Sequence, residues 1–202
     1  MATRRRGQKD VVDAALGILD EVGLDALTLR EVARRLDAHL NTVSFQVKTK
    51  ARLLELMADK VMGTLTLEDL PADPLERVEE IFRRYRRALL SHRDGARLVA
   101  GTNVVEQNTL RVGNAIVEAL LDADVEPGVA ASTFWGMHYF LLGLVEEEQS
   151  DDAAARADFV GRMSAEQYPA LFRVQDELVS TSFEERFDFG IEAFIRNAQR
   201  TP

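Results

Sequence analysis

A run of polar side chains between Leu40 and Gln46 has the composition of a segment that reads DNA. Hydroxyl and amide groups hydrogen-bond to base edges in the major groove, and basic groups on either side hold phosphates. Val43 and Val47 are expected to turn inward, whereas Phe45 either meets a thymine methyl group or braces the helix. The residues predicted to contact DNA are Thr28, Arg30, Leu40, Asn41, Thr42, Ser44, Phe45, Gln46, Lys48 and Lys50.

Two short helices are expected to hold this segment in place. Thr28 followed by Glu31 predicts a capping box at the start of a helix that runs to about residue 36. Residues 37–39 break that helix and residues 40–47 form a second one, which gives the layout of a helix-turn-helix motif. The alternative is that both helices belong to an ordinary bundle whose polar face is solvated.

Apolar residues recur with helical spacing along almost the whole chain. The sequence therefore predicts an all-α fold of about nine or ten helices, with a three-helix head in residues 1–50 and a helical body in residues 51–202. Besides the two short helices, helices are expected over residues 8–22, 48–67, 75–91, 96–101, 108–123, 129–149, 169–179 and 182–199, with a loop over 150–162.

The charge of the chain divides at the same point. The 202 residues carry a formal net charge of −9, which by itself argues against a nucleic-acid partner because phosphate repels an acidic protein. Residues 1–50 hold nine basic and seven acidic side chains, so their formal charge is +2 and that of the remainder is −11. A slightly basic head on an acidic body indicates different partners for the two parts.

Catalytic and metal-binding classes lack support in the sequence. The chain has no cysteine, which excludes thiol catalysis, disulfide frameworks and cysteine zinc sites. His39, His92 and His138 fall on separate predicted elements, without the spacing of a helical zinc site, and no nucleophile motif is present. We therefore expect no enzyme activity, no metal and no cofactor.

Membrane insertion and secretion are not expected either. We expect no membrane span, which requires an apolar run of roughly 18 uncharged residues. The first seven residues lack the hydrophobic stretch of a signal peptide. A soluble protein of the cytoplasm is the resulting prediction.

Seven segments form a recognisable pattern: residues 28–36 (TLREVARRL), 41–50 (NTVSFQVKTK), 53–54 (LL), 91–97 (SHRDGAR), 101–102 (GT), 143–149 (GLVEEEQ) and 189–191 (FGI). In these segments the chain resembles the tetracycline-repressor (TetR) family, and in its body it resembles the tetracycline-class repressors. Most family members have Tyr at Ser44, His at Gln46 and Gly at Asp37, so these departures imply weaker binding or a different target. The arginines at positions 4–6 either reach a neighbouring groove or form a solvated tail.

The resemblance implies a homodimer. The segment 129–149 is apolar around most of its circumference, and Gly136 and Gly143 would let another helix approach. In the family this helix and the last one pair with their copies in a second subunit, the alternative being an ordinary monomer core. A dimer also suits the head, since two-fold symmetry doubles the length of the DNA site that is read. The two recognition helices are then expected about 34–36 Å apart.

A ligand pocket is expected in the body, between the helices predicted over 75–91, 96–101, 108–123 and 129–149. Pockets are mostly apolar with a few polar anchors, although each such residue can equally belong to the core. The candidate ligand-binding residues are Phe82, Tyr85, Val99, Thr102, Asn103, Leu110, Asn114, Phe134, Trp135, His138 and Tyr139.

The resemblance also bears on the ligand. Tetracycline-class repressors bind drug-chelated magnesium with a histidine where this chain has Val99, and they carry an arginine at Asn103. Glu147 matches an acidic residue that reaches across the family dimer toward that metal, or it is simply a solvated helix end. Because the histidine is missing, we expect an effector other than a magnesium–tetracycline complex.

These observations predict a homodimeric, ligand-responsive repressor that binds a palindromic DNA operator and is released by a small, largely apolar effector. The effector must favour a state with the heads at another spacing, with the 48–67 helix as the lever. The alternative is a ligand-independent DNA-binding activator or architectural factor without an effector pocket. A third interpretation is an enzyme or small-molecule carrier on the same helical body.

Overall fold

The computed structural model describes residues 7–102, 105–150, 158 and 161–200. The arginines at positions 4–6, Asn103 and most of the loop expected over 150–162 therefore lie outside the described residues. Within the described part the chain forms eleven helices and no strand, which agrees with the predicted all-α class and slightly exceeds the predicted number of helices.

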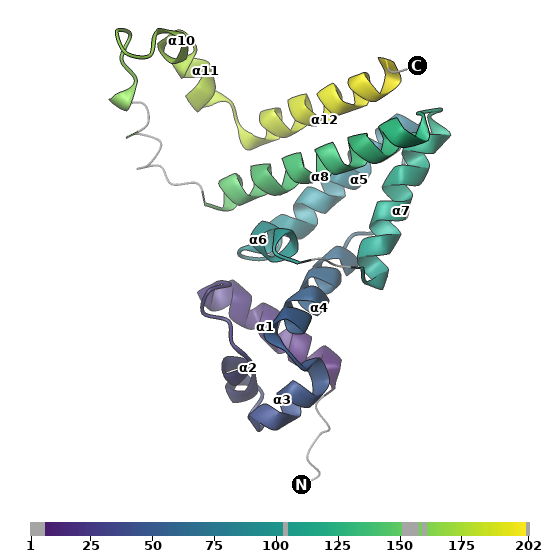
Figure 1. Cartoon of the computed structure of the whole chain (residues 1–202), viewed down its shortest axis with the longest axis vertical. Helices are drawn as coiled ribbons and strands as arrows, with labels where there is room; N and C mark the ends of the chain where they lie inside the picture. The colour runs from purple at the N-terminus through teal and green to yellow at the C-terminus, as the bar shows by residue number, and fades with distance from the viewer. Residues whose placement is uncertain (1–6, 103–104, 151–157, 159–160, 201–202) are drawn as a thin grey trace.

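Three helices form the head at one end of an elongated molecule (Figure 1): α1 (Gln8–Val22), α2 (Leu29–Arg35) and α3 (Leu40–Val47). They pack on one another around side chains such as Leu19, Val32 and Val43, which are fully buried. Thr28 caps α2, because its Oγ1 accepts a hydrogen bond from the backbone N–H of Glu31 at 3.1 Å, but the predicted capping box is only half formed, since the Glu31 carboxylate binds Arg34 instead. The head therefore has the predicted helix-turn-helix layout.

Helix α3 is sharply bounded at both ends. It begins after His39, whose backbone is extended, and it ends where Lys48 adopts a φ of +60°. That left-handed angle is uncommon for a residue with a side chain, and it turns the chain away from the axis of α3. Thr49 then caps the next helix, its Oγ1 accepting from the N–H of Arg52 at 3.0 Å. Helix α3 is therefore limited to eight residues.

Helix α4 (Lys50–Gly63) links the head to the body and is shorter than predicted. The expected range of 48–67 is wrong at both ends. Lys48 cannot join the helix in its left-handed conformation, and β-branched threonines at 64 and 66 disfavour its continuation. Helix α4 contacts α1 and α3 of the head and also three helices of the body, so a boundary at residue 50 stays a prediction.

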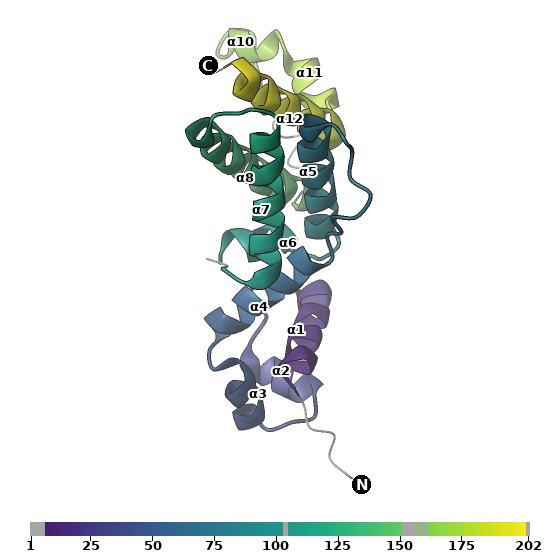
Figure 2. The same ribbon diagram turned by 90° about the vertical axis from the view of Figure 1, so that its right-hand side faces the viewer.

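The body contains the remaining helices: α5 (Pro74–Leu90), α6 (Gly95–Ala100), α7 (Gln107–Asp122), α8 (Pro127–Gln149), α10 (Pro169–Phe172), α11 (Gln175–Ser180) and α12 (Phe183–Arg200). Helices α5, α7 and α8 pack against one another around fully buried Phe82, Ile116 and Met137 (Figure 2). Helix α12 lies along α8, farther from the head (Figure 1).

The single helix expected over 169–179 is wrong, because α10 and α11 are separate. Val174 lies between them with φ −124° and ψ 16°, which is not a helical conformation. A β-branched residue loses rotamer freedom in a helix, so it is a favourable place for the break.

Helix α8 corrects the expectation about membrane spans. An 18-residue window of α8 has a mean hydropathy of 1.3 and is long and apolar enough to cross a bilayer, although only 39% of the window is buried. In the fold, α8 packs against α5, α6, α7 and α12. Because α8 is apolar around its circumference and only partly buried by these helices, part of its apolar surface remains uncovered in the single chain.

Candidate functional site

Helix α3 presents polar side chains to solvent. Val43 and Val47 are buried, as predicted, whereas Asn41 and Thr42 are exposed. Phe45 is 80% exposed, so the interpretation in which it braces the helix is wrong. Contact with a bound partner, such as a thymine methyl group, is its remaining predicted role.

Basic side chains without carboxylate partners flank α3. Arg30, Lys48 and Lys50 are exposed, and among the residues that the structure describes none of them forms an ion pair. The other two arginines of α2, at positions 34 and 35, each pair with a glutamate of the head. Cations left unpaired in this way are available to phosphate groups.

The other predicted DNA contacts lie close to the caps and ends of these helices. The Thr28 oxygen accepts the capping bond, and its O–H remains able to donate. Leu40 is exposed, whereas Ser44 and Gln46 are half-buried. The Gln46 carbonyl accepts a hydrogen bond from Gln8 Nε2 at 3.2 Å, which ties the end of α3 to the start of α1.

Six of the predicted ligand-binding residues form one connected ring cluster, which consists of Phe82, Tyr85, Phe134, Trp135, His138 and Tyr139. The Tyr85 hydroxyl of α5 lies 3.4 Å from His138 Nδ1 of α8, and the His138 ring stacks on Phe134 with centroids 6.1 Å apart. At the outer end, Trp135 and Tyr139 stack with centroids 5.6 Å apart and are 50% and 65% exposed. The cluster therefore runs from the core to the surface.

Burial keeps the polar rings of this cluster uncharged. It raises the pKa of the Tyr85 hydroxyl and lowers the pKa of the His138 imidazole. Both groups are therefore neutral at pH 7. A neutral aromatic cluster suits contact with an apolar molecule, because it offers no charge to compensate that of a charged one.

The remaining predicted ligand-binding residues that the structure describes do not belong to the ring cluster. Val99 is buried in α6, and the Thr102 hydroxyl is occupied by the Val99 carbonyl at 3.0 Å. Leu110 and Asn114 are exposed on α7. The sequence shows which of these residues are polar, but it does not show which hydroxyl already donates a hydrogen bond to a backbone carbonyl.

Helices α8 and α12 fit together through two glycines. A Cβ at Gly136 would lie 2.7 Å from Phe194, and one at Gly190 would overlap Phe140, so each glycine receives an aromatic ring of the opposite helix. Gly143 has nothing within 4 Å of its Cβ position. An open groove of about 740 Å³ begins there, lined by Tyr139, Phe140, Gly143, Leu144, Glu147, Thr181, Glu185, Arg186 and Phe189.

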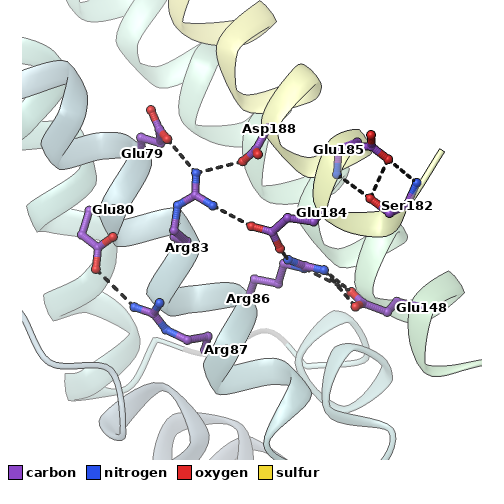
Figure 3. A network of polar contacts seen from close by, with 10 residues as sticks. All are labelled: Glu79, Glu80, Arg83, Arg86, Arg87, Glu148, Ser182, Glu184, Glu185 and Asp188. Atoms are coloured by element: carbon purple, nitrogen blue, oxygen red, sulfur yellow. Dashed lines mark hydrogen bonds and ion pairs between the residues drawn. The ribbon is translucent and has the colours of Figure 1, made fainter.

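A network of ion pairs around the buried Arg86 fixes α12 in this position (Figure 3). Arg86 of α5 binds both carboxylate oxygens of Glu148, with N–O distances of 2.8–3.1 Å, and also binds Glu184. Arg83 binds Glu184 and Asp188 at 2.7 and 2.8 Å. Sequence reasoning missed this network, because pairs between distant helices have no characteristic spacing.

Glu147, the residue matched to a metal-directed acid, instead pairs with Arg186 at 3.1 Å. It remains largely exposed at the end of α8. Among the described residues, no group of three or more His, Asp or Glu side chains could hold a metal ion.

The turn between α5 and α6 connects the body to the head. Gln149, the last residue of α8, donates to the His92 carbonyl at 2.7 Å and accepts from the Ala96 N–H at 3.2 Å. On the other side of the turn, Asp94 accepts a hydrogen bond from the Leu24 N–H of the head at 2.8 Å. Sequence reasoning singled out neither Gln149 nor Asp94 for this role.

Known proteins share both the sequence pattern and this architecture. The model of the tetracyclin repressor-like C-terminal domain matches residues 69–196. The chain belongs to the TetR family. The tetracycline repressor protein class G of Vibrio anguillarum is 30% identical over 195 residues, which cover 94% of this chain and 92% of that protein.

Solved TetR-family structures match almost the whole chain. Apo ActR from Streptomyces coelicolor has a TM-score of 0.89 and 26% identity, covering 98% of this chain and 97% of its own. BioQ in complex with its double-stranded DNA operator has a TM-score of 0.71 and 26% identity, covering 96% and 98%. The predicted family and its helical architecture are therefore confirmed, and the chain is a TetR-family transcriptional regulator.

Proposed function

We propose that this TetR-family regulator is a homodimeric repressor that binds a palindromic operator and leaves it when a small, largely apolar effector binds the body. The observation that carries the proposal is the surface of α3, where exposed polar side chains and Phe45 lie between unpaired cations. The division into residues 1–50 and 51–202 and a cytoplasmic location belong to the same proposal.

The open α8–α12 groove supports the dimer. Phe189 and Tyr139 are 75% and 65% exposed there, and Gly143 leaves space for a side chain from outside. The groove is continuous with the face on which α8 and α12 already pack together. A second copy would cover these rings, and its head would supply the second half of the operator contact.

The ring cluster of α5 and α8 supports the effector site. Solved relatives bind small molecules: ActR is known in complex with actinorhodin, and a TetR variant from Acinetobacter baumannii in complex with minocycline. In this chain the cluster is uncharged and reaches the surface at Trp135, which does not line the α8–α12 groove. A flat aromatic effector without a bound metal ion is the class that fits these rings.

The DNA-binding part is tested by an Arg30→Ala/Lys50→Ala double variant. Each phosphate contact contributes about 0.9 to the slope of log K against log salt, and the proposed dimer loses two contacts from each head, so we expect weaker binding and a slope reduced by about 3.6. The measurement is binding at several salt concentrations to a duplex selected from a random library by the wild-type protein.

The matched control is an Arg34→Ala/Arg35→Ala variant. It removes the same charge, but from arginines already paired with glutamates. We expect its salt slope to stay close to that of the wild type. An unchanged slope in the Arg30/Lys50 variant would contradict the assignment of the head.

Tryptophan fluorescence tests the effector site, since Trp135 is the only tryptophan of the chain. We expect actinorhodin, used as a flat aromatic probe, to quench Trp135 and to raise the Tm. Phe134→Ala should weaken this binding about fivefold, because it removes a ring packed against Trp135 and His138, whereas Tyr168→Ala should not. Unchanged fluorescence and Tm with both actinorhodin and minocycline would favour the alternative, a ligand-independent DNA-binding factor.

A further inference from the structure

The first turn of α7 is capped by a residue of another helix. Both Asn108 and Thr109 donate their backbone N–H groups to Asp59 Oδ1 of α4, at 2.9 Å each. The Asn108 side-chain amide donates to Asp59 Oδ2 at 2.8 Å. These N–H groups occupy the second and third positions of α7, which have no partner within their own helix.

The residue that normally caps a helix is engaged elsewhere. Glu106, at the cap position of α7, makes no side-chain capping bond. Its carboxylate binds Arg52 of α4 instead. The acidic residue before α7 therefore binds α4, and an acidic residue of α4 caps α7.

These two contacts attach one face of α4 to α7 at two positions along the axis of α4. Arg52 and Asp59 are seven residues apart, which is two helical turns and about 10.5 Å of axis. Farther along α4, a Cβ at Gly63 would lie 3.0 Å from the Asn108 amide, so the backbone of α4 also lies close to α7. A helix attached at one point can pivot, whereas attachment at two separated points resists rotation.

We propose that Asp59 is a positioning residue that locks α4 to the first turn of α7 and thereby fixes the angle of the head. Helix α4 leads directly out of α3, because only Lys48 and Thr49 separate the two helices. A displacement of the first turn of α7 is carried to the recognition helix through Asp59. This inference rests on the proposed function only for the expected effect on DNA binding. The attachment of α4 to α7 does not depend on the proposed function.

The experiment measures the position of the head directly. The chain contains no cysteine, so Ala26→Cys in the head and Glu118→Cys on α7, both exposed, give a unique pair for spin labels. Labelled chains are mixed with an excess of unlabelled chains, and the distance distribution within one chain is recorded. We expect Asp59→Ala to broaden the distribution about twofold and to weaken binding to the selected duplex about tenfold.

Two further variants separate positioning from stability. Asp73 caps α5 through the N–H groups of Leu75 and Glu76, so Asp73→Ala removes a similar cap that does not involve α4. It should lower the Tm about as much as Asp59→Ala but leave the label distances unchanged. Asp59→Asn keeps an acceptor oxygen for the α7 N–H groups and should restore most of the narrow distribution.

The outcomes are distinguishable. If Asp59→Ala lowers the Tm like Asp73→Ala and leaves the distances unchanged, Asp59 is only a helix cap and the proposal is overturned. Because the distances are measured without DNA, they test Asp59 even in a protein that selects no duplex, which would contradict the proposed function alone.

Discussion

Replacing Phe189 with aspartate is expected to separate the proposed dimer into monomers. Phe189 is 75% exposed beside the open groove, so a single chain leaves its ring in water. Burying such a side chain stabilises an interface by about 1.5–3 kcal/mol, and two-fold symmetry applies the effect twice. A carboxylate placed there must also be desolvated near Glu185. We expect the dimer Kd to rise at least about 10³-fold.

Sedimentation at micromolar concentration measures this change as a shift from the dimer mass to the monomer mass. Operator binding should fall in parallel, because one head reads only one half-site. The control is Phe172→Asp on α10, a partly exposed phenylalanine outside the groove lining, which should leave the dimer intact. A dimer that persists in the Phe189 variant would place the interface on another face.

Gly95→Ala should cause the largest loss of stability among glycine substitutions in the body. A Cβ at Gly95 would overlap the carbonyl oxygen of Leu89, a backbone atom of the last turn of α5 that cannot rotate away. Overpacking of this kind costs about 3 kcal/mol, which lowers the Tm of a chain of this size by roughly 6–12 °C. Thermal unfolding followed by circular dichroism measures it.

The same substitution should loosen the head, because the α5–α6 turn holds Asp94 against the Leu24 N–H. Gly17→Ala in α1 is the matched control. Its Cβ would meet only the end of Arg35 at 3.5 Å, so better helix propensity should leave the stability unchanged or about 1 kcal/mol higher. Equal melting temperatures for Gly95→Ala and the wild type would show that the turn relaxes around the new methyl group.

The sequence predicted the elements whose signals are local. Thr28 caps α2, Val43 and Val47 are buried, and the start of α5 lies within one residue of the expected position, because capping and amphipathic spacing are properties of neighbouring residues. The same local signals overextended the linking helix, since the left-handed conformation of Lys48 depends on how the head turns into α4.

The site was only partly predictable for the same reason. Ring spacing on α5 and α8 placed six aromatic residues in one cluster, but it could not show that the Thr102 hydroxyl is already bonded. The Asp59 cap joins residues about 50 positions apart in the chain, and the Arg86–Glu148 pair joins residues still farther apart. No periodic pattern encodes such pairs, because the fold alone brings them together.

The short, sharply bounded α3 limits how much information the regulator can read from DNA. Eight residues span about 12 Å, which is the length of roughly three or four base-pair steps. Two copies in the proposed dimer would then specify about seven base pairs. A sequence of that length occurs by chance about once in 16,000 positions, among the roughly 10⁶–10⁹ competing sites of a genome. In the proposed dimer, direct reading by α3 alone would therefore not single out one operator. We expect the shape and stiffness of the DNA between the contacted bases to supply part of the remaining information, so changes in the spacer between half-sites should alter regulation as changes in contacted bases do.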